Sequence, residues 1–515
     1  MNFDPSQLNI GRGKQLLLDD LVIESAENIC RTWHEPKKTD ESPLIAKDKP
    51  WENVAYFSCN TWQVIRDPKD GLFKCLYSDW NKPHVKPGEQ ACGKSVFNIL
   101  YAESEDGINW QKPLLGIHKI NGQDTNVIIP NAYDPGLLLD PHEPDPGKRF
   151  KMLCTGFKPG GDVAAILAVT SGDCIHWKPM DELPTMGRHG SRLDDVIILH
   201  YDHYGRMYVM NTRHYDMYAI ERNLKNPVLN HWTLTYYPMD WRRQNKRRIW
   251  QSESSDMIHW SEPYVVLAPT DGEDDLDETF YGLCQYAAGD LTIGFLNTMS
   301  YVSNTMNVRL VYSRDGKTWH HLNKRQPFLA PSADGAWDAY MVTVPSNPLE
   351  VGDELWVYHG GSDNHHDWWC TGAREGVKSP EATDISLVHY GLGLAKLRLD
   401  GFASLDAGYA RPGILITRQL ISDGTNLLVN ARCKHEGSIA AEIVDVNDEV
   451  IPGLSRADCD VFTGDSVRHT FSWQGKTDIP VFSSERAMYP EAERERFRKI
   501  RFFIENAELY SFALA

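Results

Sequence analysis

A seven-residue pattern, Ser-x-Asp-x-x-x-Trp, occurs four times in this chain of 515 residues. The copies begin at Ser104, Ser171, Ser254 and Ser313, and each follows a short run of strand-forming residues. Their tryptophans are separated by 67, 83 and 59 residues. Ser and Asp side chains bind backbone N–H groups in tight turns, so each copy predicts a hairpin whose next strand begins at the Trp. Four copies at these spacings predict a repeated β unit.

The spacing of the copies also sets the size of the unit. Helical periodicity is nearly absent before residue 400, so each unit is expected to hold four strands. Repeated four-stranded units are typical of the blades of a β-propeller. We predict five blades, the fifth marked by a weaker echo of the turn at Asp400 and Gly401. We expect residues 15–23 to pair with the last blade and so to close the ring.

After Phe402 the repeat stops and a different β pattern begins. Residues 427–431, 438–444 and 466–473 alternate in the manner of strands. They predict a separate antiparallel sandwich that packs against the propeller, since no Gly- or Ser-rich linker precedes it. The predicted fold is therefore all-β: a five-bladed β-propeller over residues 1–402, followed by a C-terminal β-sandwich over residues 403–515.

Charge and composition exclude several classes of partner. The formal net charge is −18, which disfavours nucleic acids and anionic membranes as partners. No apolar run approaches the roughly 18–20 residues of a membrane helix. The N-terminus has no signal-peptide pattern, which favours a cytoplasmic location, or a periplasmic or secreted one if a leader has been removed. The ten cysteines lack metal-binding spacing and are expected to be reduced thiols, most of them buried.

Acidic residues stand where several inner strands of the propeller are expected to begin. They are Glu52, Asp134, Asp194 or Asp195, Glu278 and Asp338. In a propeller these positions converge at one mouth of the central axis, so the carboxylates repel one another and some pKa values rise. Glycosidic cleavage needs such a set, with one acid kept protonated and another ionised. The alternative interpretation is that individual acids only cap turns at the beginnings of the blades.

The chain resembles a known group of enzymes in three stretches: residues 16–20 (Leu-Leu-Leu-Asp-Asp), residues 398–408 and residues 463–469. Together with the five blades and the added sandwich, they resemble glycoside hydrolases of families 32, 43, 68 and 117, and family 32 most of all. The resemblance implies three acids from successive blades: Asp134 and Asp195 as base or nucleophile and its partner, and Glu278 as general acid. The Asn-Asp-Pro-Asn and Glu-Cys motifs of family 32 are missing, which leaves the sugar open.

Further side chains are candidates for binding a sugar. Asp338 follows Trp337 in the fifth blade and is an equally plausible catalytic acid. His366 and Trp368 lie on a loop that we expect over a sugar pocket, where aromatic faces meet sugar C–H groups. The full set of candidate substrate-binding residues is Trp51, Glu52, Asp194, Arg213, Tyr281, Trp337, Tyr340, His366 and Trp368.

No cofactor is expected from the sequence. The acidic run at residues 271–278 could bind a structural Ca²⁺, although a solvated acidic loop is the simpler interpretation. A loop of His365, His366 and neighbouring acids could also ligate a metal, but its tryptophans favour contact with sugar or a plain surface loop.

The predicted function is that of a glycosidase that acts from the chain end of an oligosaccharide or glycan. One alternative is a glycan phosphorylase or lyase, in which Arg192, Arg213 or Arg248 would bind phosphate. Another is a carbohydrate-binding propeller without catalysis. The sugar, the linkage, the stereochemical outcome and the oligomeric state stay open.

Overall fold

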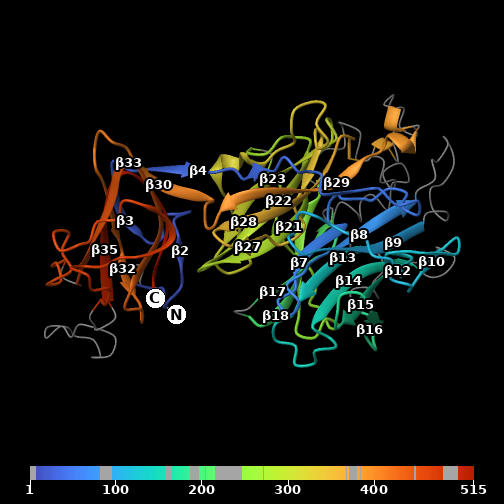
Figure 1. Ribbon diagram of the computed structural model, residues 1–515, viewed down its shortest axis with the longest axis horizontal. Coiled ribbons are helices and arrows are strands. Elements are labelled where there is room, and N and C mark those ends of the chain that lie inside the picture. Colours follow the sequence, from blue (N-terminus) through green and yellow to red (C-terminus); the bar gives the residue numbers. More distant parts are fainter. Residues whose placement is uncertain are drawn as a thin grey trace.

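The computed structural model describes residues 7–81, 96–157, 164–185, 196–202, 205–214, 246–270, 272–366, 368–369, 380–382, 384–445, 448–479 and 497–515. Here the chain forms strands joined by turns, with short 3₁₀ helices at Asn323–Arg325, Pro380–Ala382 and Ile385–Leu387 (Figure 1). The all-β prediction is confirmed. Among these residues, no helix has the length and apolar character needed to cross a membrane. The eight described cysteines are free, and six of them are buried.

The predicted turn motifs form hairpins by the bonds that the sequence indicates. In the first copy, Ser104 Oγ accepts the Gly107 N–H at 2.9 Å. Asp106 Oδ1 accepts the N–H groups of Ile108 and Asn109 at 2.8 and 2.7 Å. Trp110 Nε1 then donates to the Gly107 carbonyl at 3.1 Å. The copies that begin at Ser171, Ser254 and Ser313 repeat the Ser and Asp bonds, so the repeat is built on local side-chain-to-backbone contacts.

The repeated strands form antiparallel groups that follow the chain. Group 1 holds β7 (Trp62–Arg66), β8 (Phe73–Asn81), β9 (Val96–Ser104) and β12 (Val127–Pro130), beside the hairpin β10 (Lys119–Ile120) and β11 (Gln123–Asp124). Group 2 holds β13 (Ala132–Leu139), β14 (Phe150–Phe157), β15 (Ala164–Ser171) and β16 (Trp177–Pro179). Group 3 holds β17 (Ile198–Asp202), β18 (Met207–His214), β19 (Arg248–Ser254) and β20 (Tyr264–Leu267).

Two further groups complete the series. Group 4 holds β21 (Glu278–Ala288), β22 (Leu291–Ser300) and β23 (Thr305–Ser313), with β24 (His320–His321) and β25 (Pro327–Leu329) on its outer side. Group 5 holds β26 (Met341–Thr343), β27 (Leu349–Val351), β28 (Glu354–Ser362) and β29 (Tyr390–Arg398), with β5 (Lys37–Lys38) and β6 (Ile45–Ala46) on its outer side. One parallel pairing, Met306 with Met341, joins groups 4 and 5 into a single hydrogen-bonded sheet.

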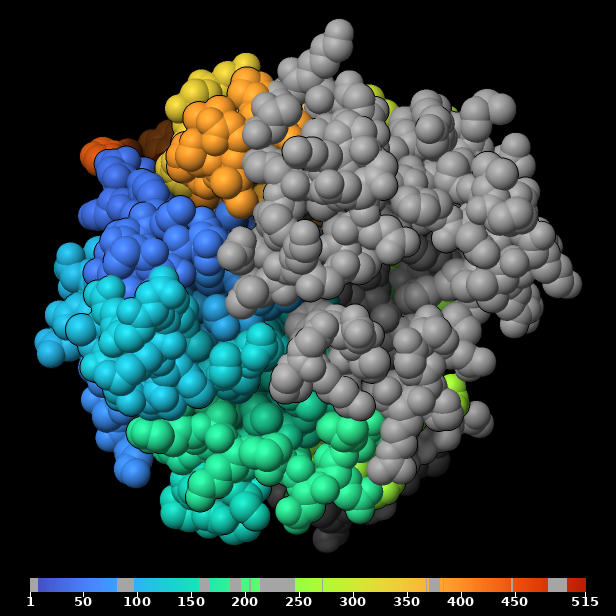
Figure 2. All heavy atoms as spheres, turned by 90° about the vertical axis from the view of Figure 1, so that its right-hand side faces the viewer, coloured from blue at the N-terminus to red at the C-terminus, as the bar shows by residue number. Residues whose placement is uncertain are grey.

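Hydrogen bonds link each group to the next and the last group to the first. The linking pairs are Ser78–Asp134, Lys151–Tyr208, Asn211–Gln285, Asn297–Val344 and Pro345–Gln63. Because this series returns to group 1, the described groups form a closed ring, as expected of a propeller. Figure 2 shows the same order around one face, from blue through cyan to green, with the orange segment of group 5 beside blue.

The ring closes through a different segment from the one predicted. Residues 37–46 supply the closing strands, since β5 and β6 both pair with β29. The expectation that residues 15–23 would close it is wrong: β2 (Gln15–Leu16) pairs with β35 and β3 (Ile23–Glu27) with β31. The reason lies in three consecutive leucines whose side chains alternate. Leu17 enters the core of the C-terminal sheet, whereas Leu16 and Leu18 enter the core of the propeller.

The C-terminal sheet has ten strands among the described residues. They are β1 (Gln7–Asn9), β2, β3, β4 (Cys30–Trp33), β30 (Ala403–Ala407), β31 (Gly413–Thr417), β32 (Gln419–Ile421), β33 (Leu427–Val444), β34 (Asp465–Thr470) and β35 (Phe497–Leu514). A second core lies between this sheet and apolar residues of 451–479. The strands of residues 7–33 therefore hydrogen bond with the C-terminal sheet, not with the propeller, and the division of the chain at residue 402 stays a prediction.

The turn motifs generate a test of the fold. The residue at their fourth position has a positive φ in all four copies, at Gly107, Cys174, Met257 and Gly316. We expect Gly316→Ala to lower the free energy of unfolding by about 1 kcal/mol, because its added methyl meets only open space and the cost is backbone strain. Gly107→Ala should cost about 2 kcal/mol more, because its Cβ would lie 2.5 Å from Tyr358 Oη. Urea denaturation measures both, and equal losses would contradict this packing.

Candidate active site

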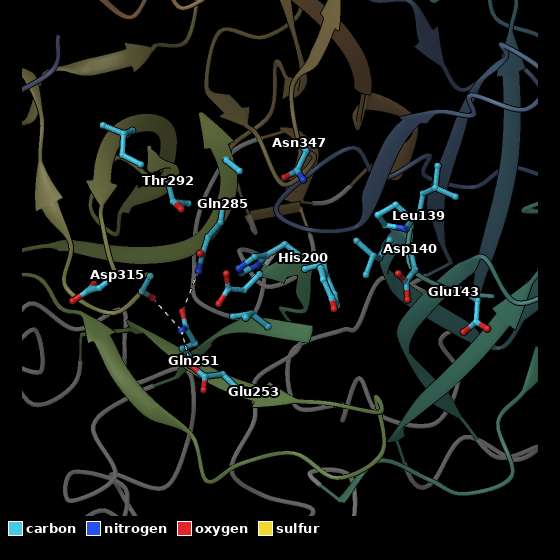
Figure 3. Close-up of a pocket in the computed structure, with 18 of the residues that line it drawn as sticks. Leu139, Asp140, Glu143, His200, Gln251, Glu253, Gln285, Thr292, Asp315 and Asn347 are labelled. Carbon is cyan, nitrogen blue, oxygen red and sulfur yellow. Dashed lines mark hydrogen bonds between the residues drawn. The ribbon is translucent and has the colours of Figure 1, made fainter. Parts of the chain in front are cut away.

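The inner strands of the ring all end at one side of it and begin at the other. Residues at or just after the ends of β13, β17, β21 and β26 line one cavity, among them Asp140, His200, Gln285 and Asn347 (Figure 3). We call this end the lower mouth. Because these strands end together, their beginnings lie together at the opposite end of the ring, which we call the upper mouth. The sequence-based candidates Asp134, Glu278 and Tyr281 belong to the beginnings of β13 and β21.

Asp134 occupies a distorted position at the upper mouth. The pairing of β13 with β14 shifts between Tyr133 and Gly136, so Asp134 lies in a β-bulge. Its φ is +59° and its exposure is 1%. A positive φ is uncommon for a residue with a side chain, and such strain concentrates at functional sites, where bulges redirect side chains. Asp134 is thus a buried carboxyl group held at the beginning of an inner strand.

Tyr281 lies in the matching bulge of group 4, where the pairing of β21 shifts between Phe280 and Gly282. Its hydroxyl lies 2.5 Å from His366 Nε2. The guanidinium of Arg213 lies 3.4 Å from the centre of its ring, and that of Arg247 lies 4.9 Å from it. Strands and loops of groups 3, 4 and 5 therefore place two cations, a phenol and an imidazole in one buried cluster. The sequence-predicted residues Arg213, Tyr281 and His366 come together here.

An aromatic stack lies beside this cluster. The ring of His365 lies between Tyr340, at 4.3 Å, and Trp368, at 3.9 Å, with nearly parallel planes. His365 Nδ1 lies 3.1 Å from a carboxylate oxygen of Glu381, which fixes the middle ring. Tyr340 and Trp368 are half-buried. Stacked rings of this kind offer rigid apolar faces of the sort that sugar C–H groups contact.

Glu278, the first residue of β21, is buried within group 4. Arg309 of β23 holds both its carboxylate oxygens, with nitrogen–oxygen distances of 2.6 and 2.7 Å. Arg309 also reaches Asp274 at 3.2 Å. Burial raises the pKa of Glu278 to about 7, although the charge of Arg309 opposes this shift. A carboxyl group with that pKa can hold a proton near neutral pH, as a general acid must.

Asp338 and Trp337 are bound inside group 5. Asp338 is 1% exposed, and Lys38 Nζ of β5 donates to its carboxylate at 2.5 Å. Lys38 also donates to the Ala330 carbonyl at 2.7 Å. Trp337 packs against Gly361, Gly391 and Gly393 and stacks on His359 with ring centres 5.5 Å apart. Asp338 therefore pairs with the closing strand β5, whereas Trp337 packs on β28 and β29.

Trp51 and Glu52 are likewise held by neighbours in group 1. Glu52 accepts hydrogen bonds from Tyr77 Oη at 2.6 Å and from Lys112 Nζ at 2.7 Å. Trp51 Nε1 donates to Asn126 Oδ1 at 2.8 Å. Both side chains are buried. Glu52 Oε2 also accepts the backbone N–H groups of Asp48 and Lys49 at 2.9 and 3.0 Å, which matches the turn-capping alternative. Asp194 and Asp195 lie outside the described residues.

The acidic run at residues 271–278 contains a buried member with cationic partners. Asp274 accepts from Arg325 Nη1 at 2.8 Å in addition to Arg309. Among the described residues, no group of three His, Cys, Asp or Glu side chains is placed to hold a metal ion. Arginines therefore neutralise Asp274, and a structural Ca²⁺ at this run stays a prediction.

Sequence reasoning missed the parts played by Arg309, Arg247 and His365. Arg309 gave no signal, because it alternates with the apolar residues Met306, Val308 and Leu310 and so falls on the polar face of its strand. For Arg247, nothing in the sequence places its guanidinium over a tyrosine 34 positions later. Such contacts arise only when the blades come together.

Comparison with known proteins gives structural likenesses only. No protein-family model and no curated protein matches the chain. Among solved structures it is similar to a glycosyl hydrolase from Bacteroides ovatus, with 12% identity, a TM-score of 0.44, and coverage of 75% of this chain and 97% of the other. An N-acetylgalactosamine deacetylase from F. plautii, solved with blood group B trisaccharide, has 13% identity, a TM-score of 0.42 and coverage of 72% and 96%. A thermostable family-43 glycoside hydrolase has 12% identity, a TM-score of 0.39 and coverage of 68% and 92%.

We expect Lys38→Met to destabilise the ring. The substitution leaves the buried carboxylate of Asp338 without its cation, which should lower the free energy of unfolding by about 2–4 kcal/mol. The matched control is Lys37→Met on the same strand, whose exposed side chain should change stability by less than about 0.5 kcal/mol. Thermal or urea unfolding distinguishes the two variants, and equal effects would show that the Lys38–Asp338 pair does not hold the closing strand.

The raised pKa of Glu278 predicts a pH-dependent stability. Between the ordinary pKa of 4.5 and about 7, the folded protein keeps a proton that the unfolded chain has released. Stability therefore falls as pH rises through this range, whereas Glu278→Gln lacks this titration. We expect the unfolding free energy of the unaltered protein, minus that of the variant, to drop by about 1–3 kcal/mol from about pH 5 to pH 8. A difference that stays level with pH would exclude a protonated Glu278.

Proposed function

We propose that the protein is a glycoside hydrolase that acts from the chain end of an oligosaccharide or glycan at the upper mouth. The observation that carries the proposal is the convergence there of Arg213, Tyr281 and His366 from three groups of the ring. Asp134 is strained and buried at the same end of the inner strands. The proposal also draws on the family resemblance of the sequence, and it agrees with an acidic chain that repels polyanions.

Glu278 is the proposed general acid. Its pKa of about 7 keeps a large share of the carboxyl groups protonated at neutral pH, so it can give a proton to the leaving glycosidic oxygen. Asp134 is then the base or nucleophile, or the residue that orients it, and Asp195 takes the other part. Asp338 stays an alternative catalytic acid, and its carboxylate is paired with Lys38 of the closing strand.

The buried cluster and the aromatic stack have binding roles in this proposal. The Tyr281 hydroxyl and His366 can exchange hydrogen bonds with sugar hydroxyls, while Arg213 and Arg247 hold the phenol ring in place. The stack of Tyr340, His365 and Trp368 provides apolar faces for the sugar ring.

A glycan phosphorylase is the second candidate. The observation that favours it is the pair of guanidinium groups of Arg213 and Arg247 within 5 Å of the centre of the same phenol ring, since arginine is a strong phosphate ligand. In that case inorganic phosphate would take the place of water as the attacking group, and the product would be a sugar phosphate.

The experiment that tests the proposal is a screen of aryl glycosides and natural oligosaccharides, run with and without inorganic phosphate. Release of free sugar without phosphate supports the hydrolase. Release of sugar phosphate that depends on added phosphate favours the phosphorylase. Binding without cleavage of any glycan favours a carbohydrate-binding propeller and contradicts both enzymes.

On a proven substrate, we expect Asp134→Asn to lower kcat by about a hundredfold or more with the fold intact, since the variant removes a reacting carboxylate. Asp353→Asn, at an exposed turn, is the matched control and should leave kcat unchanged. The rate should fall on the alkaline side with a pKa of about 7, as Glu278 loses its proton. Unchanged turnover in the Asp134 variant would remove that residue from the reaction.

A further inference from the structure

The lower mouth encloses a cavity of about 600 Å³, on the opposite side of the ring from the proposed active site. Cavities that hold small molecules commonly measure about 300–1,000 Å³, so one or two sugar rings would fit. Figure 3 shows Gln285, His200, Gln251 and Asn347 arranged around it, from different parts of the ring. None of these side chains has a part in the proposed reaction.

The cavity has a polar floor with unused hydrogen-bonding capacity. Gln285 is 4% exposed, and its Nε2 donates to Asn211 Oδ1 at 2.6 Å and to Gln251 Oε1 at 3.0 Å. No described residue donates to Gln285 Oε1, which is therefore an available acceptor. Asn347 Oδ1 accepts from the Cys284 thiol, and its Nδ2 is an available donor among the described residues. A buried acceptor and a nearby donor, both from primary amides, suit a ligand with hydroxyl groups, which donate and accept at once.

The charges of the lining disfavour an anionic ligand. Its two arginines are engaged by carboxylates: Arg149 holds both oxygens of Asp67 at 2.6 and 2.5 Å, and Arg314 reaches Asp290 at 2.5 Å. The third cation, Lys317, lies 3.6 Å from Glu253. The carboxylates of Asp140, Glu143, Asp202 and Glu253 also line the cavity. Phosphates and uronic acids would meet a negative wall, whereas a neutral ligand would not.

Apolar side chains form the rest of the wall. They are Leu138, Leu139, Pro141, Val209 and Ala287. A sugar ring presents C–H groups on its faces and hydroxyls at its edge. The apolar wall suits the C–H faces, and the amide floor suits the hydroxyls. We propose that the lower mouth is a second carbohydrate site, which binds a neutral mono- or disaccharide.

This site binds sugar without cleaving it. Asp140 is the most buried of its carboxylates, and it accepts from Tyr208 Oη at 2.5 Å and pairs with Lys151 at 2.8 Å. Glu253 accepts from Tyr264 Oη at 2.8 Å. Burial tends to raise the pKa of Asp140, but the hydrogen bonds from Lys151 and Tyr208 lower it below its usual range, so this carboxylate is ionised near neutral pH. The inference therefore stands whether or not the upper mouth proves to be hydrolytic.

The test uses the full chain with Asp134→Asn, so that turnover does not interfere. Glucose, galactose, mannose, xylose, maltose, lactose and cellobiose are titrated by calorimetry, and we expect at least one to bind with a millimolar Kd. Ala287→Trp fills the cavity from an exposed strand position, without removing a hydrogen bond, and should weaken that binding by about tenfold or more. Ala46→Trp, at an exposed position on β6, is the matched control and should keep it.

Three outcomes would overturn the proposal. One is that none of these sugars binds, and another is that Ala287→Trp binds them as well as Ala46→Trp does, which would assign the binding to the upper mouth. The third concerns spermidine as a cationic probe of the acidic wall: if it binds and is lost in Ala287→Trp while the sugars do not bind, the site takes cations. Hydrolysis by the chain with Asp134 restored should be the same in the two Trp variants, which separates this test from that of the proposed function.

Discussion

The pairing of β5 and β6 with β29 is the contact on which the ring depends. A sheet that ends in an open edge exposes unpaired backbone groups, and a propeller avoids this only when its last group meets its first segment. Here residues near the beginning of the chain hydrogen bond to a strand about 350 positions later. Lys38 adds an ion pair to this contact, since it reaches the buried carboxylate of Asp338.

Local chemistry explains how much of this fold is readable from the sequence. The Ser and Asp residues of the four turn motifs bind backbone groups two or three positions away, so the motif specifies its hairpin without help from the rest of the chain. The ring-closing segment has no such motif. Residues 15–23 and residues 37–46 both look like short strands, and which of them meets β29 depends on where Leu16, Leu17 and Leu18 find their cores.

The same distinction between local and long-range contacts applies to the candidate site. Acids at the beginnings of strands could be found by pattern, and Asp134 and Glu278 are indeed buried there. The surroundings of these acids could not be predicted, because bulges decide where a side chain points and because the cations that pair with the acids come from other parts of the chain. Arg309 of β23 reaches Glu278 of β21 across the intervening strand β22, and Lys112 reaches Glu52 from 60 positions later in the chain. The predicted acids therefore differ in their surroundings: Glu278 has a raised pKa, whereas Glu52 caps a turn.

The three leucines at the boundary also bear on how the molecule comes apart. Leu17 packs in one core, and its two neighbours pack in the other. Unfolding of either core therefore displaces the backbone of residues 16–18, which also belongs to the second core. The N-terminal strands belong to a sheet whose other members lie beyond residue 402 and include β35, so residues through Leu514 must be synthesised before that sheet is complete. Assembly of the two halves is thus a late event in synthesis, and melting should couple them into one cooperative transition.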